Sequence, residues 1–130
     1  MTDKRFEELV AEALERIPRH FRDAMHNVVL VIEDEPSPEV LAENGIEPPE
    51  TLYGLYEGTP LAEREWWGQV TEFPDRVTIF RTPILEDAED EDDVFRAIGE
   101  TVIHEFGHHF GLSEEEIDEA EAIWREEIGD

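Results

Sequence analysis

The chain has 130 residues, of which 36 are acidic and 10 basic, giving a formal net charge of -26, and it contains no cysteine. This length is typical of one domain, and so strong a negative charge argues against nucleic acid and anionic membranes as partners. Without cysteine there are no disulfides or thiolate sites, so histidine and carboxylate are the only strong ligands for a transition metal.

The start of the chain bears on its location. The first ten residues lack the basic start and apolar run of a signal peptide, and no apolar stretch approaches membrane-spanning length. We therefore expect a single cytoplasmic domain over residues 1–130, with no membrane contact, as a monomer or a homodimer.

The N-terminal third predicts a helix and then a strand. Apolar residues recur at three and four spacing from Phe6 to Ile17, which predicts a helix over residues 3–25 that Pro18 ends or kinks. Residues 27–32 form a β-branched run typical of a buried strand. Residues 37–50 contain Asn-Gly and Pro-Pro pairs, which predict a short helix or turn followed by a loop.

Two more strands are predicted in the middle of the chain, over residues 52–57 and 76–81. Residues 61–72 between them have no assignable pattern. Their Trp66 and Trp67 are expected in the core, although such residues can also line a pocket or a subunit contact. The acidic patch over residues 86–93 is expected to be a solvated loop that leads into a helix.

Two helices are predicted at the C-terminal end. An apolar stripe at helical spacing indicates the first over residues 93–110, and Gly111 is a natural stop after it. Ser113 with Glu116 three residues later is typical of a capping box, which predicts a final helix over residues 114–128.

The sequence H-E-x-x-H on the first of these helices carries the chemistry. Helical positions four apart lie on the same face about 6 Å apart, so His104 and His108 can direct two imidazoles at one ion. Glu105 lies beside them and could serve as a general base for the water that a zinc ion activates. The alternative is that the histidines lie on a polar face by chance.

The remaining histidines are less suited to a metal. His104 and His108 fall on the flank opposite the apolar stripe of their helix, whereas His109 points back towards that stripe and is expected to be a core or supporting residue. His20 and His26 have no partner spacing and are expected to be structural or exposed.

The third metal ligand is left open by the pattern. A chain that turns back at Gly111 could bring Glu114, our preferred candidate, to the metal. Glu115 is an alternative, while Glu116 would be engaged in the capping box. Acidic residues in a first helical turn are also favoured by the helix dipole alone, so Glu114 could have no metal role.

Three stretches together resemble a known family, the minimal zincin-like metallopeptidases: GLYEGTPLAER at residues 54–64, PDRVTIFRTPIL at residues 74–85 and IHEFGHHFGLSEEE at residues 103–116. The resemblance implies a small α+β zincin-like domain with an N-terminal helix, a short three- to four-stranded sheet, an active-site helix and a C-terminal helix. It implies metal binding by His104 and His108 beside Glu105. Family members carry aspartate at the position of Glu114, so the glutamate here is a departure.

The expected function is that of a zinc metallopeptidase of the HExxH type. Such an enzyme would bind one Zn²⁺ per chain and hydrolyse a peptide or protein substrate, with Glu105 as the base. Two alternatives come from other classes of protein. One is an inactive zincin-fold module that binds metal or protein, and the other is an acidic interaction module with incidental histidines.

Overall fold

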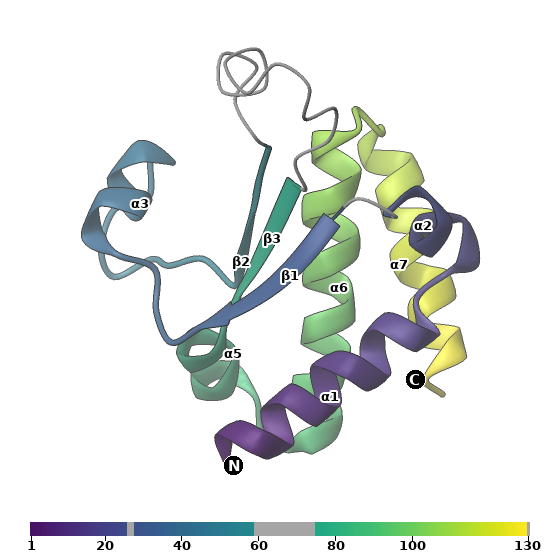
Figure 1. The fold of residues 1–130 in the computed structure, drawn as a ribbon, viewed down its shortest axis with the longest axis horizontal. Helices are drawn as coiled ribbons and strands as arrows, with labels where there is room; N and C mark the ends of the chain where they lie inside the picture. The colour runs from purple at the N-terminus through teal and green to yellow at the C-terminus, as the bar shows by residue number, and fades with distance from the viewer. Residues whose placement is uncertain (26–27, 59–74, 130) are drawn as a thin grey trace, which may run out of the picture.

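The computed structural model describes residues 1–25, 28–58 and 75–129, which form an α+β fold (Figure 1). The elements in chain order are α1 (Asp3–Arg16), α2 (Arg19–Ala24), β1 (Val28–Glu33), α3 (Pro38–Glu43), β2 (Gly54–Glu57), β3 (Asp75–Phe80), α5 (Arg81–Asp87), α6 (Glu91–His109) and α7 (Glu114–Glu127). The unassigned segment with its two tryptophans lies outside the described residues, as do His26 and the side chain of His20.

The N-terminal helix forms for the reasons that the sequence indicates. The Thr2 hydroxyl accepts a hydrogen bond from the Arg5 backbone N–H at 3.1 Å and caps α1. The helix ends before Ile17, whose backbone is extended because the residue preceding a proline is disfavoured in a helix. Pro18 therefore ends α1, as predicted, and α2 follows as a separate helix.

The described sheet has three strands in the order β1-β3-β2. β1 pairs with β3 in parallel, with Leu30 opposite Val77, and β2 pairs with β3 antiparallel, with Gly54 opposite Ile79. Within the described residues β2 pairs only with β3, so it is an edge strand. All three predicted strands are confirmed, with bounds shifted by one or two residues.

α6 is the central helix of the core. It packs against β2 and β3 on one side and against α1 and α7 on the other (Figure 1). The largest fully buried side chains come from every layer of this arrangement: Trp124, Phe6, Phe80, Ile17, Ile79, Ile84, Ile98, Ile103, Ile117, Val77 and Val102. Because its neighbours are packed on it from several sides, α6 is a rigid support for the residues of the H-E-x-x-H sequence.

The acidic patch differs from its prediction as a single solvated loop. Its first two residues belong to α5, and its last three form the first turn of α6. No helix was predicted over residues 81–87, which contain Pro83, but proline is compatible with a first helical turn, where the backbone N–H has no intrahelical partner. Pro83 and Ile84 are buried, so packing stabilises this short helix.

No helix in the described ranges combines the length and the hydropathy that crossing a membrane requires.

Candidate active site

The chain turns sharply between α6 and α7. Gly111 has a φ of 74°, a left-handed conformation that side-chain-bearing residues rarely adopt. The Gly111 N–H donates to the His108 carbonyl at 3.1 Å, and the Leu112 N–H donates to the Gly107 carbonyl at 2.9 Å. These two bonds form a Schellman motif, which ends α6 and directs the chain back along it.

The turn places the start of α7 beside the end of α6. Ser113 and Glu116 form the predicted capping box, with both hydrogen bonds at 3.1 Å. Glu116 is thereby engaged with backbone, and Glu114 Oε1 lies 3.2 Å from His108 Nε2. The geometry therefore brings the preferred candidate ligand to the second histidine of the sequence.

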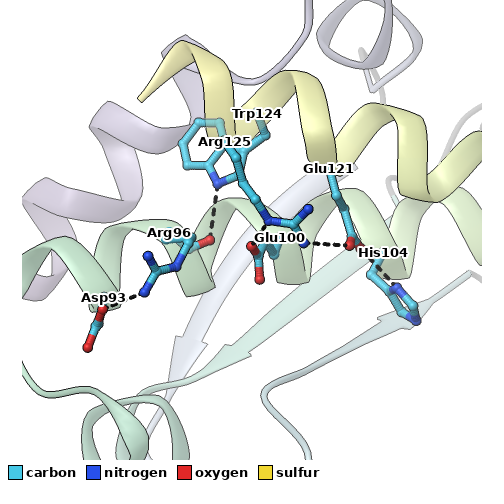
Figure 2. A network of polar contacts seen from close by, with 7 residues as sticks. All are labelled: Asp93, Arg96, Glu100, His104, Glu121, Trp124 and Arg125. Carbon is cyan, nitrogen blue, oxygen red and sulfur yellow. Dashed lines mark hydrogen bonds and ion pairs between the residues drawn. The ribbon is translucent and has the colours of Figure 1, made fainter. Parts of the chain in front are cut away.

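The two histidines of the H-E-x-x-H sequence contact each other directly. His104 Nε2 and His108 Nε2 are 3.0 Å apart. On the other side of the ring, His104 Nδ1 lies 3.1 Å from Glu121 Oε1, a contact that Figure 2 shows. An ionised carboxylate only accepts, so His104 donates from Nδ1 and its Nε2 carries a lone pair. His108 then donates to that lone pair from its own Nε2.

Glu105 lies next to this pair and lines a pocket of about 340 Å³. Burial raises the pKa of the Glu105 carboxyl above its ordinary value, while the neighbouring His104 and His108 act in the opposite direction and lower it. A half-buried carboxyl with a raised pKa beside two imidazoles in a pocket is typical of a general base.

Comparison with known proteins places the chain in a family. The model of a family described as zincin-like metallopeptidase matches residues 25–124, which is most of the chain and includes the turn, both histidines, Glu105 and Glu114. The chain belongs to this family. The predicted small zincin-like α+β domain is thereby confirmed.

A solved structure supports the fold of this zincin-like protein. A conserved hypothetical protein from Thermus thermophilus matches with a TM-score of 0.55 and 24% sequence identity, over 84% of this chain and 94% of that chain. None of the curated proteins matches the chain. The likeness extends over most of both chains and shows the fold alone.

The family implies zinc binding in general, and the described part of this zincin-like protein brings together a pair of candidate ligands rather than a completed set. No group of three or more histidine, aspartate or glutamate side chains in residues 1–25, 28–58 and 75–129 is arranged to hold a metal ion. The two Nε2 atoms are 3.0 Å apart, a distance that a hydrogen bond between the rings explains, and the Glu114 side chain is 69% exposed and lies against His108. To bind a metal ion through Nε2, His108 would have to carry its proton on Nδ1 instead.

The pocket beside Glu105 is bounded by three elements. Residues 51–54 of the edge strand and the segment before it form one wall, α6 forms the second, and Glu121 of α7 contributes to the third. A Cβ atom built on Gly54 would lie 2.5 Å from Thr101 Cγ2, so only glycine lets the strand approach α6 this closely. Gly54 therefore sets the distance between the two walls.

His109 was expected to be a core or supporting residue, and it does not lie in the core. Its side chain is 38% exposed, its ring stacks on Tyr56 with centroids 3.8 Å apart, and its Nε2 is 3.7 Å from Asp75 Oδ2. The helical wheel placed His109 towards the apolar stripe, but α6 extends past the core at this end, so the ring covers the edge of the sheet instead.

Glu121 is the site residue that sequence reasoning missed. It follows Ala120 on the face of α7 that packs on α6, between the buried Ile117 and Trp124. A carboxylate at the border of an apolar helix face was the available signal. Its contact with His104, 17 positions earlier, depends on how the two helices pack, which a pattern within one helix does not show.

We expect the metal-free Glu105→Gln variant to be more stable than the wild-type protein at neutral pH. Because the folded-state pKa of Glu105 is raised, folding favours its protonated form, and the wild type loses stability as pH rises through that pKa. Glutamine carries no charge, so the variant avoids this loss. Urea unfolding in chelator from pH 4 to 8 checks this: the advantage should close towards pH 4.5, the ordinary pKa of the group. A constant difference across the range would contradict the assignment.

Proposed function

We propose that this protein is a zinc-dependent peptidase in which His104, His108 and Glu114 hold one zinc ion per chain and Glu105 is the general base. The observation that carries the proposal is the convergence of the two histidine Nε2 atoms, 3.0 Å apart, beside the pocket that Glu105 lines. Two imidazoles, a nearby carboxylate and a half-buried base are the set that metal-assisted hydrolysis requires.

The spacing of the nitrogen atoms suits zinc. Two ligands at about 2.0–2.1 Å from a tetrahedral ion lie about 3.3 Å from each other, so the two rings need to separate by only about 0.3 Å. The Glu114 carboxylate lies 3.2 Å from His108 Nε2 and its exposed side chain is free of the core, so it can complete the set without disturbing the fold.

Glu105 supplies proton transfer. Bound zinc contributes Lewis acidity, which makes water a nucleophile at neutral pH and polarises a carbonyl. Glu105 accepts the proton of the attacking water and delivers it to the leaving amine. Its place one residue after His104 keeps its carboxylate next to the ligand pair, while the pocket wall around it excludes part of the solvent.

A peptide is the substrate class that the surroundings favour. β2 is one of the two edge strands of the described sheet, and its N-terminal end lines the pocket next to His104 and Glu105. An extended peptide can bind such an edge through main-chain hydrogen bonds, which places one of its carbonyl groups along the pocket. The pocket of about 340 Å³ has room for a side chain of that peptide.

Calorimetric titration of the chelator-treated protein with zinc tests the proposal. We expect one zinc ion per chain in the wild type, and loss of binding in His108→Ala. The matched control is His109→Ala, which removes the next histidine of the same helix, stacked on Tyr56, and should bind zinc as the wild type does. Zinc at a hundred times its Kd should also add about 2.7 kcal/mol to the free energy of unfolding.

The titration also separates the alternatives. Zinc binding that is unchanged by His108→Ala would refute the assigned site, and absent binding would leave an acidic interaction module with incidental histidines. If one zinc binds but a broad peptide library shows no cleavage, the protein is a metal-binding module on a zincin scaffold without turnover.

A further inference from the structure

Glu121 of α7 is positioned to act on the site through His104. Its Oε1 lies 3.1 Å from His104 Nδ1, and its side chain is only 14% exposed (Figure 2). A carboxylate this sheltered from water needs partners, because an unpaired buried charge is costly. We infer that Glu121 is a positioning residue that fixes His104 in its Nδ1–H tautomer and so presents the Nε2 lone pair to the site.

The direction of this hydrogen bond determines which nitrogen is free. The ionised Glu121 carboxylate can only accept, so Nδ1 carries the proton and Nε2, on the side of His108, does not. The proposed function assigns that nitrogen to zinc. The expected effect of Glu121 on zinc affinity therefore rests on the proposed function, whereas the tautomer of His104 does not. A carboxylate behind a ligating histidine fixes the ring orientation and makes the histidine a stronger ligand.

Glu121 itself has a charged partner in Arg125. Arg125, one helical turn further along α7, lies 3.5 Å from Glu121 Oε2 through Nη2 and 2.9 Å from Glu100 Oε1 through Nε. Figure 2 shows the resulting row of side chains, which crosses from α6 to α7 and back and ends at His104. One oxygen of Glu121 thus serves Arg125 while the other serves the imidazole.

The packing of α7 on α6 determines how close Glu121 lies to His104. Trp124 is fully buried, and its indole N–H donates to the Arg96 carbonyl at 3.1 Å. A Cβ atom on Gly99 would lie 2.1 Å from the Trp124 ring, so the two helices approach closely at this point. Since Trp124 and Glu121 lie one turn apart on α7, this anchor fixes the distance from Glu121 to His104.

The test compares Glu121→Leu, Glu121→Gln and Glu119→Leu. Leucine removes every acceptor, and glutamine keeps one carbonyl oxygen, which His104 and Arg125 must share. Glu119 is exposed on the same helix, so its replacement removes the same charge without touching the site. If Glu121→Leu does not fold, Glu121→Gln retains the shape of the side chain and is compared with Glu119→Gln.

The first measurement is made without metal. Nitrogen NMR of the imidazoles, assigned with a His104→Gln variant, should show His104 as the Nδ1–H tautomer in the wild type and in Glu119→Leu. In Glu121→Leu the signals should shift towards a mixture of tautomers, with a smaller shift for glutamine. A wild-type His104 protonated on Nε2, or a tautomer that Glu121→Leu leaves unchanged, would overturn the inference.

The second measurement is zinc affinity by competition with a chromophoric chelator. Glu121→Leu should bind zinc about 10- to 100-fold more weakly than the wild type, Glu121→Gln should show a smaller loss, and Glu119→Leu should be unchanged. An equal loss in both leucine variants would show a general charge effect and refute a positioning role. Wild-type protein that binds no zinc would refute the proposed function alone, because the tautomer is read without metal.

Discussion

Glu105→Gln is expected to lower kcat/KM for peptide hydrolysis by about 10²- to 10⁴-fold while zinc remains bound. Glutamine has nearly the same size and keeps a carbonyl oxygen, but it cannot accept the proton of the attacking water. Glu105 lines the pocket and burial raises its pKa, so it is sheltered enough to hold a proton between attack and departure of the leaving amine. The substitution leaves the proposed zinc ligands His104, His108 and Glu114 unchanged.

The measurement is steady-state cleavage of a peptide that the zinc-loaded wild type hydrolyses, identified from a library, with zinc content determined on the same samples. Glu119→Gln is the matched control, because it removes an exposed carboxylate from α7. Full activity in zinc-loaded Glu105→Gln would disprove the general-base role. If the variant lost both zinc and activity, Glu105 would be needed for zinc binding, and the general-base role would not explain the lost activity.

Trp124→Ala is expected to lower the free energy of unfolding by about 3–5 kcal/mol, the largest stability effect that we predict for a single residue. The indole is fully buried between α7 and α6, and it lies against Gly99, Phe95 and the Arg96 carbonyl. Alanine removes the contacts of a whole ring, and the surrounding helices can close such a cavity only in part. The same helix carries Glu114 and Glu121, so zinc affinity should fall as well.

Urea unfolding of metal-free protein measures this effect, with the shift in midpoint evaluated at a constant slope. Trp124→Phe is the control, because it keeps most of the ring volume and loses the indole N–H. It should cost much less than alanine, with the lost hydrogen bond contributing about 1 kcal/mol. A loss of less than about 1 kcal/mol in Trp124→Ala would show that α7 is anchored elsewhere.

Local sequence patterns predicted the elements that carry the site. The apolar stripe, Gly111 and the pair of Ser113 with Glu116 gave α6, its end and the start of α7 within two residues of the observed bounds. These features depend on neighbours within one turn of helix, which a linear pattern records directly. For the same reason the contact of Glu114 with His108 could be anticipated, because only the short turn separates the two residues.

Predictions failed where contacts between distant elements control the structure. α5 was missed because its burial against α6, rather than its own pattern, stabilises a short helix that contains Pro83. The helical wheel favoured a core or supporting place for His109, but the wheel does not show where the core stops along the helix axis, and His109 lies beyond it. Glu121 was not recognised because its partner lies on another helix.

The amino-acid sequence alone determines the spacing of His104 and His108 and the place of Glu105 between them, because each is a property of residues close together in the chain. Packing between helices and strands determines which other side chains contact these three residues. Gly99 allows Trp124 to bring α7 against α6, and that approach places Glu121 behind His104. Gly54 likewise brings the edge strand to α6 and forms the pocket beside Glu105. Both are close approaches between elements far apart in sequence, and their distances depend on packing that no periodicity within one element records.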